Sequence, residues 1–186
     1  TRQVKIATLE APLASYDYWN NYAVYVSNVL QVYEDGETRR ALECINKGES
    51  VTYSALEEEY IQDVRRGDIL AVHLNTAGQI DSGVFKIYDA ASGAVTESVK
   101  VNEKETHYGW YGTVTAKDSS NLLLTGENGE TRCIPLSAPK YVTVYDPSAD
   151  SAEQMFRTGT AGEINRNARI LVYVRSGDCL DIAVFE

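Results

Sequence analysis

The two histidines are the first residues to consider for chemistry, because imidazole is the side chain that most readily exchanges a proton near neutral pH. His73 lies in an apolar segment with strand character, and His107 lies in a connector between two similar halves of the chain. Tyr173 takes the place of His73 in the second half. Neither histidine has a serine or cysteine at a spacing that predicts an activated nucleophile. We therefore expect no catalytic histidine.

The carboxylates offer one candidate metal site, since hard cations such as calcium prefer oxygen ligands. Asp146, Asp150 and Glu153 form an acidic cluster in a predicted loop, without the spacing of an EF-hand. The alternative is that they complement the positive N-terminal end of a following helix. The acidic run at residues 57–59 is expected on the solvated face of another helix. Nothing selects two carboxylates for glycoside hydrolysis, so we expect no enzyme activity and no cofactor.

The three cysteines, Cys44, Cys133 and Cys179, are an odd number and have no second cysteine or histidine at metal-ligand spacing. We expect them to be small buried apolar side chains. One disulfide with a leftover thiol stays open as the alternative.

The aromatic residues are the better candidates for a binding surface. The chain has 13 tyrosines against 3 phenylalanines, and rings with a polar edge suit half-exposed interfaces and sugar contacts. They cluster before each half of the chain, which gives as candidate ligand-binding residues Tyr18, Trp19, Tyr22, Trp110 and Tyr111. The alternative is a packing role, with each tryptophan closing the end of a barrel or lying between two barrels.

An internal repeat determines the expected architecture. The segment EDGETR at residues 34–39 returns as ENGETR at residues 127–132, and DILAVHLNTAGQIDSGVF at 68–85 returns as RILVYVRSGDCLDIAVF at 169–185. The offset grows from 93 between Gly36 and Gly129 to 100 between Leu70 and Ile170, so the second half carries about seven extra residues. Such similarity indicates a duplicated unit.

Each half has the residue patterns of five strands and one helix. Residues 22–34 and 37–45 predict a hairpin around a type I′ turn at Asp35-Gly36, and Asn128-Gly129 predicts the same turn in the second half. Residues 50–53 predict a strand, matched by 141–145. A helix is expected after Ser54 and Glu57, which have capping-box spacing, and a shorter one after Ser151 and Gln154. Closing hairpins are expected at 69–75 with 80–88, and at 170–175 with 179–185.

This order predicts a mainly β protein of two tandem OB-like small β-barrels from an internal duplication, each with one short helix. The first repeat spans residues 22–89 and the second 110–186. Residues 90–109 are expected to form a connecting ribbon. Residues 1–21 are expected to hold a leading strand at 4–9 and the first aromatic cluster.

The net charge of −10 argues against nucleic acid and anionic membranes as partners, because both would be repelled by the average surface. No apolar run approaches the roughly 18 residues that a bilayer span needs, so direct membrane insertion is not expected. The chain begins Thr-Arg-Gln without methionine, from which we expect a mature product or a piece of a longer protein.

The segments VRRGDILAVHLNTAGQIDSGVFKIYD and ARILVYVRSGDCLDIAVFE resemble the carboxy-terminal region of large Firmicute surface proteins that carry S-layer homology modules. The matching residues are Val64, Gly67, Asp68, Gly78 and 181–186, and the resemblance covers most of residues 22–186. The anchoring modules themselves are not in this sequence. The resemblance implies export, a cell-surface location and a structural or adhesive role.

We therefore expect a non-catalytic structural or interaction module of a bacterial cell-surface protein, acting as a rigid spacer or assembly piece. Its partners would be other domains of a larger surface protein or neighbouring envelope proteins. The alternative is a carbohydrate- or peptide-binding module that uses the Trp19 and Trp110 clusters, with a glycan as one ligand. An enzyme with an unrecognised site is the third hypothesis.

Overall fold

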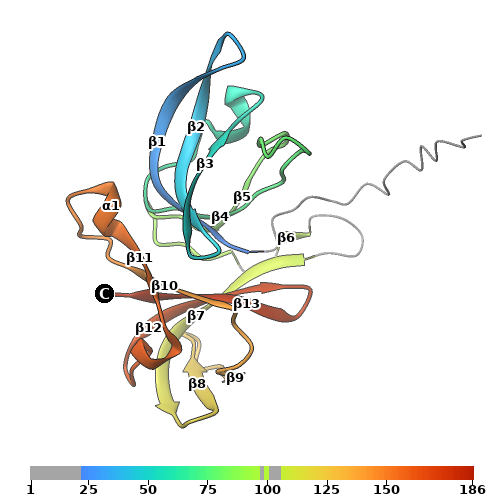
Figure 1. Ribbon diagram of the computed structural model, residues 1–186. Helices are drawn as coiled ribbons and strands as arrows, with labels where there is room; N and C mark the ends of the chain where they lie inside the picture. Colours follow the sequence, from blue (N-terminus) through green and yellow to red (C-terminus); the bar gives the residue numbers. More distant parts are fainter. Residues whose placement is uncertain (1–21, 97–98, 101–105) are drawn as a thin grey trace, which may run out of the picture.

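The computed structural model describes residues 22–96, 99–100 and 106–186. These residues form a mainly β structure with two sheets, one above the other in Figure 1. The first sheet is antiparallel, with the strand order β3-β2-β1-β4-β5. Its strands are β1 (Val24–Glu34), β2 (Glu37–Asn46), β3 (Glu49–Ser54), β4 (Ile69–Ala71) and β5 (Phe85–Tyr88). The predicted strands at 22–34, 37–45 and 50–53 are thus confirmed, while β4 and β5 are shorter than predicted.

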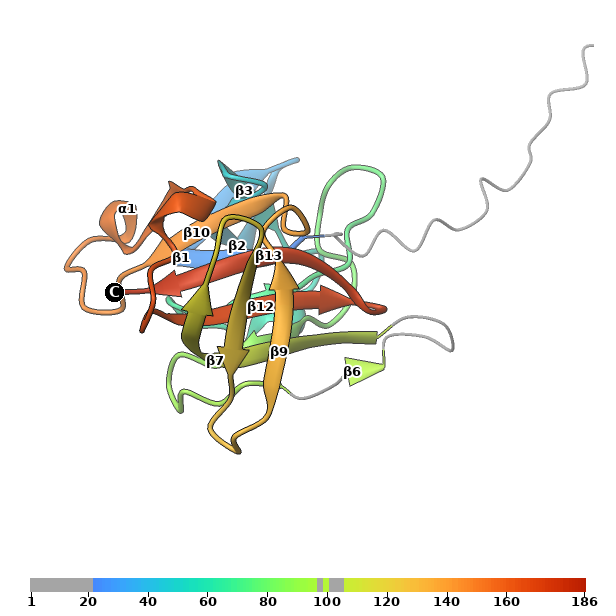
Figure 2. The same cartoon turned by 90° about the horizontal axis from the view of Figure 1, so that it is seen from below.

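The second sheet has the order β11-β10-β13-β12-β7-β8-β9, with β6 paired to β7. Its strands are β6 (Val99–Lys100), β7 (Thr106–Lys117), β8 (Asn121–Thr125), β9 (Thr131–Pro135), β10 (Tyr141–Tyr145), β11 (Phe156–Gly159), β12 (Arg169–Arg175) and β13 (Asp178–Phe185). The β10 and β13 strands are parallel, and the other pairs are antiparallel. Figure 2 shows this sheet from below, with the β7-β8-β9 meander in front.

The first predicted hairpin turn is confirmed and the second is not. Asp35 and Gly36 have φ angles of 52° and 83°, both positive as a type I′ turn requires. Of Asn128 and Gly129, only Gly129 has a positive φ, of 83°. The Asn128 side-chain oxygen instead accepts the Glu130 N–H at 3.0 Å, which closes a wider loop.

The expected helices are reduced or absent. Ser54 ends strand β3 and its hydroxyl donates to the Glu34 carboxylate at 2.6 Å, so it is not available to cap a helix. The residues that follow form only the 3₁₀ turn η1 (Glu58–Ile61). In the second half α1 (Ala152–Met155) begins after Ser151, as predicted, but without a side-chain cap. A second 3₁₀ turn, η2 (Ala161–Glu163), precedes β12.

The central strands bury both faces, because alternate residues point into different hydrophobic cores. Val24 and Val26 of β1 pack into an outer core of the first sheet, whereas Tyr25 points the other way. Val172 of β12 packs into an outer core of the second sheet, whereas Leu171 joins Tyr25. Continuous apolar runs are typical of strands covered on both faces.

The core shared by the two sheets is called the inter-sheet core below. From the first sheet it takes Ala23, Tyr25, Ile69, Ala71 and Ile87, and from the second half it takes Tyr145, Met155, Phe156, Leu171, Tyr173 and Ala183. Its rings are in direct contact: Tyr145 stacks on Phe156 with centroids 4.7 Å apart, and Tyr25 lies 5.5 Å from Phe156. The two halves therefore share one core in addition to their own.

Neither sheet closes into a barrel through the strand pairings of the described residues, so the expected pair of OB-like barrels is not found. In the first half the end of β3 approaches the segment before β5 through a single parallel bridge between Ala55 and Ile80. This contact is an isolated bridge rather than a ladder, and Ile80 also pairs with Leu74 across a local turn. The first sheet thus keeps β3 and β5 as edges.

The two halves repeat a set of backbone hydrogen bonds around β1 and β7. In the first half, Val26 N–H donates to Asp68 C=O at 2.9 Å, and Gly67 N–H donates to Val26 C=O at 2.8 Å. In the second half, Val114 N–H donates to Ala168 C=O at 2.9 Å, and Asn167 N–H donates to Val114 C=O at 2.8 Å. Both strands also carry a register shift next to this point.

The third strands differ from the expected match. β3 lies beside β2 at one edge, and the strand that takes this place in the second sheet is β9, beside β8. Strand β10, expected as the partner of β3 in the repeat, lies instead between β11 and β13.

The expected connector is divided between the two sheets. Thr96 N–H donates to Ile87 C=O at 2.9 Å, and its own carbonyl accepts Gly109 N–H at 3.1 Å. Since β7 already begins at Thr106, the last part of the expected ribbon belongs to the second sheet. The predicted strand at residues 4–9 lies outside the described residues.

Candidate binding groove

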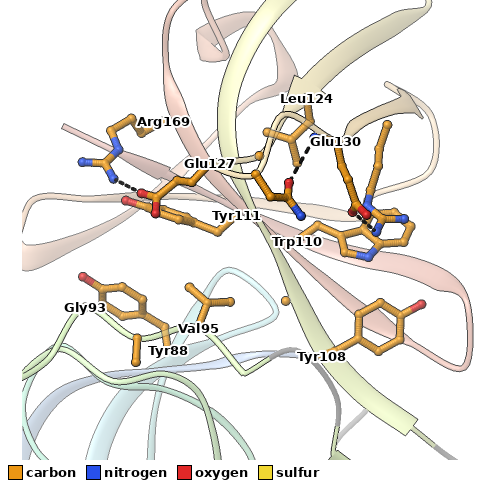
Figure 3. A pocket seen from close by; sticks show the side chains of 15 residues that line it. Tyr88, Gly93, Val95, Tyr108, Trp110, Tyr111, Leu124, Glu127, Glu130 and Arg169 are labelled. Atoms are coloured by element: carbon orange, nitrogen blue, oxygen red, sulfur yellow. Dashed lines mark hydrogen bonds and ion pairs between the residues drawn. The ribbon is translucent and has the colours of Figure 1, made fainter.

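A groove of about 1080 Å³ beside strand β7 is a surface feature that could receive a ligand. We call it the aromatic groove, because four rings from β5 and β7 line it: Tyr88, Tyr108, Trp110 and Tyr111. In Figure 3, Tyr88 and Tyr108 lie on one side of the open space, and Tyr111 and Trp110 lie on the other. The remaining lining residues are Gly93, Ala94, Val95, Gly109, Leu124, Gly126, Glu127, Asn128, Glu130, Arg132 and Arg169.

The groove lies where one edge of β7 has no partner strand, although the Gly109 N–H still donates to the Thr96 carbonyl there. On this edge β7 pairs with β8 only from Thr113 onward, and with β6 only at Thr106 and His107. Between them, the loop at residues 126–130 turns away on one side and residues 93–95 lie on the other. The side chains of the intervening β7 residues are therefore left at an open rim.

Two arginines stack on two of the rings and are paired with carboxylates from the same loop. The Arg132 guanidinium lies 4.6 Å from the Trp110 ring centroid and 3.2 Å from the Glu130 carboxylate. Arg169 lies 5.0 Å from the Tyr111 ring centroid and 3.5 Å from Glu127. A guanidinium over a ring face is attractive and restrains both groups. The rim is thus an ordered set of rings, cations and anions.

The tyrosines at the other end of the groove are anchored in the inter-sheet core. Tyr88 lies 5.2 Å from Phe185 and 6.4 Å from Tyr111, centroid to centroid. Burial is the main cause that raises the pKa of both tyrosines above the ordinary value, so their hydroxyls stay protonated at neutral pH. They can each donate and accept a hydrogen bond.

The predicted binding residues do not meet in one place. Trp110 and Tyr111 both line the aromatic groove, but Tyr22 packs edge-on against Tyr141 at 5.0 Å, with the Lys47 ammonium 5.4 Å from its ring centroid. Tyr18 and Trp19 lie outside the described residues. Tyr88, Arg132 and Arg169 were not predicted, because their position beside Trp110 depends on pairings between strands that are distant in sequence.

The candidate metal ligands are not arranged as a metal site. The Asp146 carboxylate accepts the Ser148 N–H at 2.9 Å and its hydroxyl at 2.7 Å, and these bonds lower the Asp146 pKa. Asp150 and Glu153 are exposed beside α1. No group of three His, Cys, Asp or Glu side chains that could hold a metal ion occurs within residues 22–96, 99–100 and 106–186.

The histidines take structural positions. His73 is paired with Asp81, and both side chains are partly buried. His107 was expected in the connector but lies in β7, fully buried, with its Nδ1 bonded to the Tyr173 hydroxyl. Of the cysteines, Cys44 is buried as expected, whereas Cys133 is exposed on edge strand β9, and both are free thiols.

A buried carboxylate, Asp181, was not predicted from the sequence. One of its oxygens accepts the Ala23 N–H at 2.6 Å, and the other has no hydrogen-bond partner among the described residues. Burial raises the Asp181 pKa to about 7. Its strand position gave no signal, because an aspartate near a turn is ordinarily exposed.

Comparison with known proteins does not assign the chain to a family. No family model matches it, and no match was found among curated proteins. Within the described part of the chain, no helix has the length and apolar character needed to cross a membrane.

Proposed function

We propose that the chain is a non-catalytic structural or interaction module of a bacterial cell-surface protein, acting as a rigid spacer or assembly piece. Its partners would be other domains of a larger surface protein or neighbouring envelope proteins outside the cell. The observation that carries the proposal is the inter-sheet core, because a spacer must transmit a fixed geometry between its two ends. The surface location rests on the resemblance of residues 64–89 and 168–186 to surface-protein sequences.

Hydrogen bonds at separate points along the interface support rigidity. They run from Ala23 N–H to Asp181 at 2.6 Å, from Arg66 to the Ala149 carbonyl at 2.6 Å, and from Thr158 to the Gly48 carbonyl at 2.9 Å. Contacts spread over a shared apolar core oppose both rotation and separation of two sheets.

We also propose that the two halves descend from one duplicated OB-like unit. The equivalent backbone bonds of Val26 and Val114 support this, as do the positive φ angles of Gly67 and Asn167, at 93° and 73°. The offset between Gly67 and Asn167 is 100, the same as between Leu70 and Ile170, whereas Val26 and Val114 are 88 positions apart rather than the 93 of Gly36 and Gly129. The hydrogen bonds therefore agree with the sequence repeat at Gly67 and Asn167 but not at Val26 and Val114. Because β9 takes the place of β3, the additional elements of the second half are β10, α1 and β11, which lie in the crossing from β9 to β12.

Scanning calorimetry of the whole chain tests the rigid pair. We expect one transition whose calorimetric and van't Hoff enthalpies agree, because neither sheet can expose the shared core alone. Two variants test this: Phe156→Ala, in the inter-sheet core, and Leu42→Ala, in the outer core of the first sheet. Each should lower the temperature of the single transition and reduce the free energy of unfolding by about 2–5 kcal/mol. Two well separated transitions, or a Leu42→Ala effect confined to one of them, would sink the rigid-pair proposal.

The location has a test of its own. An antibody raised against the folded chain should label intact cells of the source bacterium, and protease added outside those cells should remove the signal. Labelling that requires lysis would contradict the surface assignment without bearing on rigidity.

A further inference from the structure

We propose that the aromatic groove binds a neutral oligosaccharide, with Tyr88, Tyr108 and Trp110 contacting the sugar rings and the 126–130 loop contacting the hydroxyls. This binding activity goes beyond the spacer role and does not depend on it. Ligand sites are concave and combine apolar or aromatic walls with a small number of placed polar groups. The groove has this composition along its whole length.

The rings supply the surface that a sugar needs. A pyranose has apolar C–H faces and a polar rim of hydroxyls, and tyrosine and tryptophan likewise combine an apolar ring with a polar edge. Tyr108 and Trp110 point to the same side of β7, with centroids 5.7 Å apart, while Tyr88 comes from the other sheet. Rings from both sheets therefore face one space.

The polar groups match hydroxyls, which both donate and accept hydrogen bonds. Arg132 and Arg169 donate, Glu127 and Glu130 accept, and Asn128 does both. In Figure 3, Glu127, Glu130 and Arg169 lie on the same side of the open space. Asn128 and Arg132 line the groove together with them.

The charge balance selects a neutral ligand over an anionic one. Each arginine at the groove is already paired with a glutamate, at 3.2 Å for Arg132 and Glu130 and at 3.5 Å for Arg169 and Glu127. The whole chain carries a net charge of −10, which also disfavours an approaching anion.

The size of the groove indicates more than one sugar unit. Its volume of about 1080 Å³ lies at the upper end of the range for small-molecule sites, which is roughly 300–1,000 Å³. An open groove admits a chain that continues past both ends, whereas a closed cavity admits only a terminal unit. We therefore infer binding along an oligosaccharide.

The experiment is a glycan array that carries neutral, acidic and sulfated oligosaccharides, followed by isothermal titration of the full-length chain with the strongest neutral binder. We expect a neutral oligosaccharide to bind with an affinity that changes less than about twofold between low and high salt, because no net charge is neutralised. Trp110→Ala should weaken binding at least about tenfold.

Matched variants separate a lost site from a damaged fold. Glu130→Gln changes one exposed carboxylate at the rim and should weaken binding severalfold with an unchanged unfolding temperature. Tyr33→Ala removes a tyrosine that is 78% exposed at the β1-β2 hairpin, which is not part of the groove, and should leave binding unchanged.

Three results would overturn the proposal. They are the absence of any neutral binder, a binder whose affinity is the same in the wild type, Trp110→Ala and Glu130→Gln, and binding confined to acidic glycans or to peptides. None of these would alter the calorimetric test of the rigid pair, so failure of this inference and failure of the proposed function are distinguishable.

Discussion

The environment of Asp181 is unusual for a carboxylate. Its carboxylate is buried between the two sheets, where it accepts the N–H of Ala23, the residue before β1, and it is not bonded to any cation within the described residues. The neighbouring phenols of Tyr25 and Tyr173 and the Thr143 hydroxyl are also buried. Burial, and then the Asp181 charge, raises the pKa of Tyr25. The ionised carboxylate is thus poorly solvated.

Stability should therefore depend on pH through Asp181. Its folded pKa of about 7 exceeds the ordinary value of 3.8, so the folded state binds the proton more tightly than the unfolded state between these values. Asp181 therefore makes its full contribution to the free energy of unfolding below about pH 4, and this contribution is lost as the pH rises to 7. The Asp181→Asn side chain cannot ionise. The free energy of unfolding of this variant, relative to that of the wild type, should therefore increase by up to about 4 kcal/mol between pH 4 and pH 8.

Urea unfolding of both proteins across this pH range measures the difference. Asp178→Asn changes an exposed carboxylate at the start of the same strand, three residues before Asp181, and is the control that should show no such gain. If the difference in free energy of unfolding between Asp181→Asn and the wild type stays constant with pH, then Asp181 is not a buried carboxylate that ionises in this range.

For individual residues, the sequence predicted the chemical character of a site better than the contacts between its side chains. The aromatic character around Trp110 and Tyr111 was evident, and both line the groove. The pairing of Trp110 with Arg132 was not, because 21 positions and a β-turn separate them and only the register of β7, β8 and β9 brings them together. His107 was placed in a connector because no local pattern marks a strand that is buried by a partner more than 60 residues away.

Among the elements, β7 lines the groove and pairs with three strands of the second sheet, β6, β8 and β12, and its glycines make the close approaches possible. A Cβ on Gly112 would lie 2.2 Å from the Thr125 carbonyl oxygen, a backbone atom that cannot move aside without disturbing β8. A side chain here would therefore push β8 away at the point where the groove begins.

Gly112→Ala should accordingly destabilise the chain by about 1–3 kcal/mol, the usual cost of overpacking. Gly83→Ala is the matched control, because a Cβ on Gly83 meets nothing within 4 Å and its φ is not positive. Thermal unfolding followed by circular dichroism compares the two. Equal effects of the two substitutions would show that the close approach to Thr125 is not a constraint.

The elements that the sequence predicted well are those with local signals. Asp35-Gly36 fixes its turn because both residues adopt positive φ. The helix after Ser54 was wrong because a capping box competes with other partners, and the Ser54 hydroxyl bonds to Glu34 across the sheet. Strand β9 was not predicted separately, since its short run has only one buried side chain, Ile134.

For the whole molecule, the central question is why two small sheets hold together. Apolar runs such as residues 69–72 and 170–174 cover both faces of their strands, so each sheet has a second apolar face that water would otherwise contact. The sequence predicted a duplication with two separate barrels, because a repeat alone does not reveal which faces the copies share. The inter-sheet core forms between the two halves, so the residue pattern of either half alone does not predict it.

This shared core predicts that the halves depend on each other. If the chain is split into residues 1–105 and 106–186, each fragment loses the cover of its inter-sheet face, which includes Tyr25 and Ile69 on one side and Phe156 and Leu171 on the other. Exposed apolar faces of this kind associate, because burial stabilises by roughly 25 cal/mol per Å². Mixed in equal amounts, the fragments should form a one-to-one complex with the near-ultraviolet circular dichroism of the intact chain.

Sedimentation of the separate and mixed fragments measures this directly. The separate fragments should either self-associate or unfold at a lower temperature than the complex. Phe156→Ala in the second fragment should weaken the affinity between the fragments at least about tenfold, since it removes the ring between Tyr25 and Tyr145. Tyr33→Ala in the first fragment should leave the complex unchanged, because that ring is 78% exposed and outside the inter-sheet core. Fragments that stay monomeric, folded and as stable as the intact chain would mean that the two halves are independent domains, and the chain would then not act as a rigid spacer.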